Sequence, residues 1–249
     1  MREFKADMHI HTVLSPCGSL EMSPKIIVKS ALDAGLDIIA ITDHNSTKQS
    51  RIIKQLAEEE GLMVICGAEI NSMEEVHCIA LFEHDNELFQ FQEYLDQHLI
   101  SIKNDPSYFG FQVVVDEDEM ILEEEERLLI NALDVDVISI EKQVHQLNGL
   151  FIPAHIDRSF NGILSQLGFI PEKLKIDAVE LSQHAKISSW IGSNKIPQGT
   201  TIIQSSDAHQ PEMIGKAFTT LKMETASFSE IRLALLGQKG RSVSYKNKT

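Results

Sequence analysis

The sequence lacks long hydrophobic runs. Its opening stretch, MREFKADMHIH, has no apolar segment like that of a signal peptide, and no later segment approaches the roughly 20 apolar residues that a membrane span needs. We therefore expect a cytoplasmic protein with no membrane partner.

Cysteine and positive charge are also scarce. The three cysteines, Cys17, Cys66 and Cys78, include no CxxC pair, and their odd number argues against a disulfide framework. The 22 Lys and Arg residues against 37 Asp and Glu residues give a formal net charge of −15. Most of such a surface would repel a long nucleic-acid duplex, so we expect none as a partner.

Three common catalytic motifs are missing as well. The sequence contains no GxSxG, no GxGxxG and no GxxxxGK followed by Ser or Thr. A serine hydrolase, a Rossmann dehydrogenase and a P-loop NTPase would therefore each lack its defining residues.

What the sequence does have is an alternation of short apolar stretches with amphipathic segments. Continuous apolar runs are typical of buried parallel strands, and Ser23, Pro24 and Gly35 are helix start and stop signals. We expect strands over 3–10, 36–45, 62–70, 75–82, 149–155, 176–182, 200–209 and 217–223, and helices over 22–37, 47–60, 86–103, 140–147, 160–167, 185–192 and from Ser227 onward. Such an alternation predicts one domain, 1–249, that forms a closed or nearly closed α/β barrel.

The segment 104–126 does not fit this alternation. It contains DEDE and EEEE, and we interpret it as an acidic inserted segment whose charges form a solvated face rather than a cation site.

Histidine is abundant, with ten residues, and most of them fall at the ends of predicted strands. Since the carboxyl ends of strands in such folds meet at one mouth, these side chains should converge. Residues two apart in a strand face the same side, so His9 with His11, and Asp207 with His209, can each bind one cation together. The candidates at strand ends are His9, His11, Asp43, His44, Glu69, His77, His155, Asp207 and His209.

Each candidate has a plainer interpretation. His77 and His155 could be core histidines, Glu69 a capping carboxylate, and Asp43 either a helix cap before Thr47 or a residue that orients a ligand histidine. Three further histidines lie in helical stretches and are expected at the surface, and a fourth follows a predicted strand near the mouth: His84, His98, His145 and His184.

Six ordered motifs, DMHIH, ITDHN, GAEI, VHCIALF, PAHIDR and SSDAH, resemble those of the polymerase and histidinol phosphatase (PHP) domain family over nearly the whole chain. The resemblance implies a distorted (β/α)7 barrel with a trinuclear metal centre that hydrolyses phosphoesters. The implied cofactors are three divalent ions, for which imidazole and carboxylate ligands suit zinc, iron or manganese.

The resemblance also assigns ligands. The first metal would take His9, His11, Glu69 and Asp207, and Glu69 would bridge to a second metal held by His77 and His155. The third metal would take His44, His209 and a residue from the loop VLSPCG. In that loop Cys17 stands where relatives that resemble this chain carry a histidine, while many others carry an aspartate one residue earlier, where this chain has Pro16. Cys17 could instead be a small buried residue in a tight loop.

Two supporting roles complete this picture. Arg158 matches the family's common arginine and could bind the phosphate as a planar fork, or it could be an exposed structural arginine. Asp7 and Asp43 are expected to support the ligand histidines.

The implied reaction is attack of metal-bound hydroxide on phosphorus, because clustered divalent ions lower the pKa of water from about 15.7 towards 7. Glu69, Asp207 and Arg158 would be the catalytic side chains. The expected substrate is a small phosphate ester or short nucleotide. Two alternatives are a histidinol-phosphatase-like monoesterase and a non-catalytic, metal-binding regulatory module.

Overall fold

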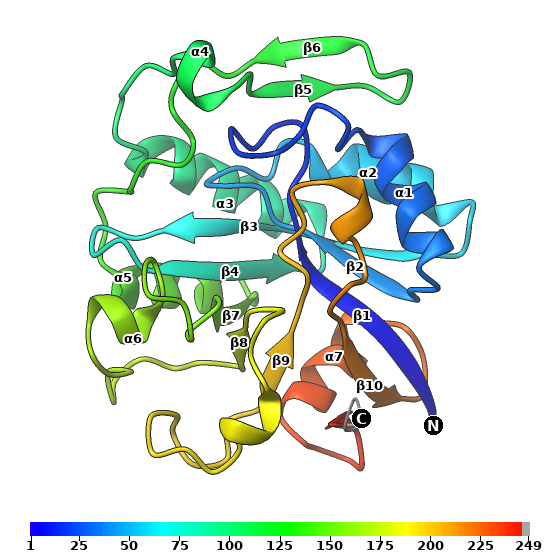
Figure 1. Ribbon diagram of the computed structural model, residues 1–249, viewed down its shortest axis with the longest axis vertical. Coiled ribbons are helices and arrows are strands. Elements are labelled where there is room, and N and C mark those ends of the chain that lie inside the picture. Colours follow the sequence, from blue (N-terminus) through cyan, green and yellow to red (C-terminus); the bar gives the residue numbers. More distant parts are fainter. Residues whose placement is uncertain (246–249) are drawn as a thin grey trace.

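The computed structural model describes residues 1–245 and shows a mixed α/β fold built on a curled sheet (Figure 1). The seven strands that line the barrel, in spatial order, are β1 (Arg2–Ile10), β2 (Ile38–Ile41), β3 (Met63–Asn71), β4 (His77–Phe82), β7 (Leu150–Pro153), β8 (Val179–Leu181) and β9 (Ile202–Gln204). The predicted distorted α/β barrel is confirmed.

Two irregular joints explain why the barrel is distorted. Strands β8 and β9 pair only with each other as regular strands, and isolated backbone hydrogen bonds connect them to the rest. On one side Ile156 N donates to Glu180 O at 2.9 Å, and on the other His11 N donates to Ala208 O at 3.0 Å. The end of β1 therefore meets the segment after β9, while its first half pairs with the antiparallel strand β10 (Thr219–Met223), which in turn pairs with β11 (Ser242–Ser244).

One barrel strand runs against the others. β1, β2 and β3 are parallel, as the strand and helix alternation predicts, whereas β4 is antiparallel to both β3 and β7. A short turn after β3 places His77 opposite Asn71. Because β4 is reversed, its first residue, and not its last, lies at the same end of the barrel as the carboxyl ends of its neighbours.

The continuous apolar runs in the sequence follow from burial on both faces of the sheet. In β2, Ile38 and Ala40 join the cluster inside the barrel, whereas Ile39 and Ile41 join a second cluster under the outer helices. The helices are α1 (Pro24–Asp33), α2 (Ser50–Glu58), α3 (Asp85–His98), α4 (Pro106–Phe109), α5 (Val137–Gln146), α6 (Ile163–Gln166) and α7 (Phe228–Leu235). None of them, within residues 1–245, is long and apolar enough to cross a membrane.

The prediction of a helix over 185–192 is wrong. Only the 3-10 turn η1 (Ile187–Ser189) forms there, and the Ser189 hydroxyl donates to the Lys186 carbonyl at 2.7 Å. Short polar side chains that bond to the local backbone in this way compete with helix formation. The helix expected over 160–167 is likewise reduced to the single turn α6.

The inserted segment 104–126 lies above the barrel in Figure 1 and contains α4 and the antiparallel hairpin of β5 (Val113–Val115) and β6 (Ile121–Glu124). The side chains of β6 are exposed, as expected, although Glu123 accepts a hydrogen bond from Lys48. Other carboxylates of the segment are bound to the barrel: Glu125 accepts from Lys48 at 3.0 Å, and Glu119 accepts from the Ser23 hydroxyl at 2.6 Å. Part of the acidic run therefore attaches the insert to the barrel and does not form a solvated face. Because the Ser23 hydroxyl is used in this contact, it does not cap α1.

Candidate metal centre

All nine predicted ligand side chains converge at the mouth of the barrel. Eight of them form three overlapping groups, within each of which the candidate ligand atoms lie within 4.8 Å of one another: His9, His11, Glu69 and Asp207; His44, Glu69 and His77; and His11, Cys17, His44 and His209. The ninth, His155, joins them through Nε2, which lies 2.9 Å from Glu69 Oε1.

Glu69, near the end of β3 and 1% exposed, is the hub of these groups. Its Oε1 lies 2.9 Å from both His77 Nδ1 and His155 Nε2. Its Oε2 lies 3.2 to 3.4 Å from ring nitrogens of the other three histidines, His44, His11 and His9. Although burial raises its pKa, the surrounding histidines, His77 first, hold the pKa of Glu69 well below its usual value.

The first group uses the period of a strand. His9 and His11 alternate on β1, and their Nε2 atoms face each other at 3.1 Å. Asp207 Oδ1 lies 3.4 Å from the first of these nitrogens and 3.2 Å from the second. Asp207 has φ of 51°, a left-handed conformation that is uncommon for a residue other than glycine and that is often found at functional sites.

The third group contains the thiol. Cys17 Sγ lies 3.0 Å from His209 Nε2, and the ring of His11 stacks on that of His209 at 4.2 Å between centroids. Burial raises the pKa of the Cys17 thiol, and the nearby Glu69 and Asp207 carboxylates raise it further. The structure therefore adds His11 to the three residues expected at this position.

Two neutral imidazoles belong to the same region. Burial lowers the pKa of His44 well below its usual value and lowers the pKa of His209 to about 4. Both rings are therefore neutral at pH 7, and the neutral imidazole is the form that binds a metal.

Asp43 holds the loop that follows β1. Its Oδ1 accepts from Thr12 N and from the Ser15 hydroxyl, both at 2.7 Å. The Ser15 oxygen also lies 2.9 Å from His11 Nδ1, so Asp43 orients that ring through Ser15. The alternative of a helix cap is wrong, because Thr47 N donates to Gln92 Oε1 and α2 begins only at Ser50.

Asp7 acts on a different part of the site than expected. Its two carboxylate oxygens accept from Ser206 N and Gly215 N, each at 2.9 Å. It therefore anchors the segment that carries Asp207 and makes no hydrogen bond to His9 or His11. Burial raises the pKa of Asp7 to about 6, against the lowering effect of the Ser206 hydrogen bonds.

Arg158 contacts the cluster through an ion pair with Asp207. Its Nη2 lies 2.5 Å from Asp207 Oδ2, the oxygen that does not face the histidine pair, and its side chain is 30% exposed. A guanidinium carries five N–H donors, so this contact leaves others available at the mouth.

Besides Ser15, sequence reasoning missed two residues that contact ring nitrogens of the cluster. Glu180 Oε2 lies 2.9 Å from His9 Nδ1, and Asn161 Nδ2 lies 2.8 Å from His77 Nε2. A carboxylate between Val179 and Leu181 in a buried strand was a signal for Glu180, whereas nothing in the sequence pointed to Asn161. Four other histidines stay outside the cluster: His84 and His184, which are exposed, and His98 and His145, which are half-buried.

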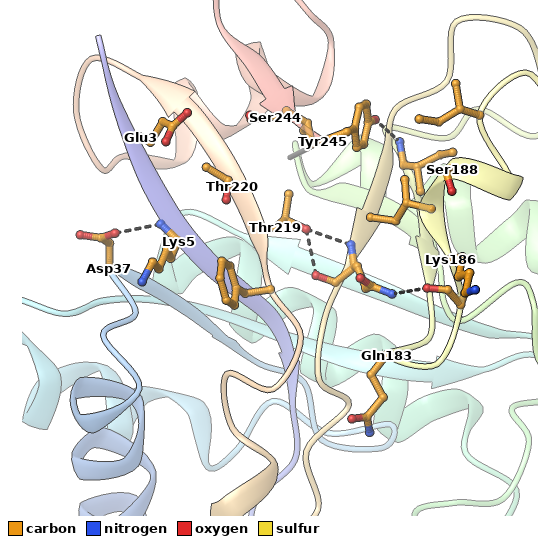
Figure 2. Close-up of a pocket in the computed structure, with 17 residues that line it drawn as sticks. Glu3, Lys5, Asp37, Gln183, Lys186, Ser188, Thr219, Thr220, Ser244 and Tyr245 are labelled. Atoms are coloured by element: carbon orange, nitrogen blue, oxygen red, sulfur yellow. Dashed lines mark hydrogen bonds between the residues drawn. The ribbon is translucent and has the colours of Figure 1, made fainter. Parts of the chain in front are cut away.

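The cluster is separate from a cavity of about 760 Å³ on the flank of the barrel (Figure 2). That cavity is lined by β1, β10, β11 and the segment around η1, including Lys5, Lys186, Thr219 and Tyr245. None of its lining residues belongs to the cluster, so the chemistry of the cluster is at the mouth and not in this cavity.

Comparison with known proteins gives family matches over most of the chain. The family described as PHP domain matches residues 7–150, and the family described as PHP-associated matches residues 198–239. The uncharacterized protein YqxK of Bacillus subtilis is 34% identical over 114 residues, which cover 43% of this chain and 28% of YqxK. The uncharacterized protein MJ1587 of Methanocaldococcus jannaschii is 39% identical over 79 residues, 28% of this chain and 46% of that protein. The match thus spans less than half of either relative.

Solved structures show the same fold. The lesion-specific endonuclease PfuEndoQ from Pyrococcus furiosus superposes with a TM-score of 0.73 and 20% identity, covering 97% of this chain and 58% of that one. A candidate metal-dependent phosphoesterase from Bifidobacterium adolescentis gives a TM-score of 0.57 and 16% identity, and the match covers 91% of this chain and 94% of that one. Endonuclease Q in complex with a 27-mer duplex that has an abasic lesion at the active site gives a TM-score of 0.68 and 20% identity. That match covers 97% of this chain and 58% of that one.

Proposed function

The chain belongs to the PHP domain family, and from this we propose that it is a metal-dependent phosphoesterase whose active site is the histidine and carboxylate cluster at the barrel mouth. One observation carries the proposal: a single buried carboxylate, Glu69, faces ring nitrogens of five histidines at 2.9 to 3.4 Å. Imidazole and carboxylate together are the ligand set of catalytic zinc, iron and manganese sites.

The donor atoms fit cations better than they fit one another. His44 Nδ1 is buried without a hydrogen-bond partner among the described residues, although Glu69 Oε2 is 3.2 Å away. In their neutral forms His9 donates from Nδ1 to Glu180, and His11 donates from Nδ1 to Ser15, whose hydroxyl donates to Asp43. Both Nε2 atoms, 3.1 Å apart, then have only lone pairs to present to each other. A cation between these lone pairs and carboxylate oxygens resolves both conflicts.

We assign three divalent ions to the cluster. The first would be held by His9, His11, Glu69 and Asp207. The second would be held by Glu69, His77 and His155, because both rings approach the same oxygen, Oε1. The third would be held by Cys17, His44 and His209, with His11 beside them. Zinc, iron or manganese suit the first two sites, and a thiolate favours zinc or iron over magnesium in the third.

The chain's own groups would divide the work as follows. When bound, the cations supply an activated water and neutralise charge on the phosphate. Glu69 and Asp207 fix the spacing of the ligands, and Arg158 binds a phosphate oxygen with the donors that its contact with Asp207 leaves available.

The substrate we propose is a small phosphate ester or short nucleotide. The net charge of −15 disfavours a long duplex, whereas the cations and Arg158 would attract a compact anion at the mouth. A histidinol-phosphatase-like monoesterase is an alternative within this class.

A nuclease is the second candidate, and the aromatic residues of the insert favour it. Tyr108 is 82% exposed and Phe109 is 43% exposed, and a Cβ on the adjacent Gly110 would lie 3.0 Å from the carbonyl oxygen of Pro16, next to Cys17. Exposed aromatic side chains bind unpaired bases by stacking. The fold shared with a lesion-specific endonuclease is compatible with this alternative.

A substrate panel tests these alternatives. We expect the zinc- or manganese-loaded protein to hydrolyse a chromogenic phosphate ester and nucleoside monophosphates, and to leave intact duplex DNA uncut, because the surface charge opposes long polyanions. The comparison substrates are histidinol phosphate, single-stranded oligonucleotides and a duplex with an abasic site. Cleavage of the lesion duplex alone would favour the nuclease, and stoichiometric metal without any hydrolysis would indicate a regulatory module.

Replacement of Cys17 by Ala should remove the third ion. Because Cys17 Sγ is the only non-imidazole atom in its group, its loss leaves the third ion without an anionic ligand and with His11 shared with the first site. We expect the bound metal to fall from about three to about two ions per chain, the number found in two-metal phosphoesterase sites. Elemental analysis after dialysis measures this. Cys66→Ala, which removes a buried thiol outside the cluster, is the control, and three retained ions in Cys17→Ala would contradict the assignment.

A further inference from the structure

Glu180 is a buried carboxylate that pairs with no lysine or arginine among residues 1–245. It occupies the middle of β8 and is 1% exposed. Its Oε2 lies 2.9 Å from His9 Nδ1 and accepts a hydrogen bond from His155 N at 3.1 Å, whereas its Oε1 is buried without a hydrogen-bond partner. One oxygen atom thus contacts two residues that belong to two different proposed metal sites.

At His9 the contact sets the tautomer. A carboxylate can only accept, so the neutral imidazole that binds a metal has its proton on Nδ1 of His9, and the lone pair of Nε2 then faces His11 and Asp207. A carboxylate on the far nitrogen of a metal-binding imidazole also makes the near nitrogen a stronger ligand.

At His155 the contact holds the backbone. This residue has φ of 29°, a conformation that L residues rarely adopt and that the surroundings must enforce. The bond from His155 N to the Glu180 side chain and the bond from Ile156 N to Glu180 O fix this turn from both sides. The turn directs the ring of His155 so that Nε2 reaches Glu69 Oε1 at 2.9 Å.

We propose that Glu180 is a positioning residue shared by the first and second metal sites, which couples the geometry of His9 to that of His155. The inference rests on the proposed function in that it takes the cluster to bind metal. It differs from the role of Asn161, whose amide contacts only His77 and therefore only the second site.

The test measures metal binding rather than turnover. Glu180→Met keeps the side-chain length but removes both acceptors, and we expect zinc affinity, measured by competition with a chromophoric chelator, to fall about 10- to 100-fold at two of the sites. Glu180→Gln retains an oxygen that can accept from both donors, so its zinc affinity should fall less than that of Glu180→Met. Asn161→Ala should weaken one site only.

The control is Glu141→Gln, because Glu141 is also buried and also lies against a histidine Nδ1, that of His145 at 2.5 Å, but outside the cluster. The cobalt-substituted proteins provide a second measurement, since ligand-field absorption reports the coordination geometry of the bound ions, which a shift of His9 or His155 would change. Glu180→Met with wild-type zinc affinity and an unchanged cobalt spectrum, even with a lowered melting temperature, would overturn the proposal. A wild-type protein that binds no zinc would instead overturn the proposed function.

Discussion

The Glu69→Gln variant is expected to lose phosphoesterase activity by more than about a thousandfold while it keeps its fold. Loss of a single hydrogen-bond donor to a developing oxyanion already costs on the order of 10²–10³ in kcat, and this change removes the ligand that two ions would share. The amide retains the shape of the carboxylate but not the charge that His77, His9 and His44 surround. The measurement is kcat/KM on the chromogenic ester with metal in excess, together with the far-ultraviolet circular dichroism of the variant.

The matched control is Glu125→Gln. Glu125 is also a buried carboxylate bound by two partners, Lys48 and Arg127, but it lies in the inserted segment. We expect this variant to keep its activity within a fewfold. Wild-type activity in Glu69→Gln would show that the cluster is not the phosphoesterase site.

The convergence of the candidate ligands could be predicted from the sequence because these residues stand at strand ends. His9 and His11 are two apart in a strand, and Asp207 with His209 and Glu69 each follow an apolar run, so local period and barrel geometry together place them at one mouth. The resemblance to the PHP family, confirmed by the family match, supplied the order in which they combine.

The remaining features depend on contacts between distant segments. A buried antiparallel strand has the same continuous apolar pattern as a buried parallel one, so the direction of β4 could not be predicted from HCIALF. The antiparallel direction of β4 is nevertheless what brings His77 to the mouth. Asn161 supports His77 from a loop 84 residues away, and no periodic signal marks such a pair. The prediction of a helix over 185–192 was wrong for a local reason, because the Ser189 side chain hydrogen-bonds to the backbone of that segment.

The inserted segment also has a role that composition alone does not reveal. Its carboxylates reach cations and hydroxyls on the barrel, and Gln49 exchanges two hydrogen bonds with the backbone of Val115, which fixes the hairpin on the barrel. In the same segment Val113 N donates to Val13 O, in the loop that carries Cys17. The insert therefore braces the loop that carries Cys17 and places exposed aromatic side chains next to that loop.

Removal of metal should have the second large effect, on both activity and stability. The cluster buries Glu69, Asp207 and Asp43 among imidazoles of which two are neutral, so without cations the carboxylates are only partly compensated. We expect a chelator to abolish hydrolysis, and zinc or manganese to restore it.

Metal binding should also stabilise the folded state by mass action, because the unfolded chain does not assemble the site. At a hundredfold excess over Kd one site contributes about 2.7 kcal/mol, which for a chain of this size raises Tm on the order of 5–10 °C. Calorimetry of the chelated and reloaded protein measures the shift. Glu69→Gln is the control for stability as well, since its Tm should respond less to metal. An equal rise in both proteins would place the stabilising ion elsewhere, and full activity in the chelated protein would exclude metal from the reaction.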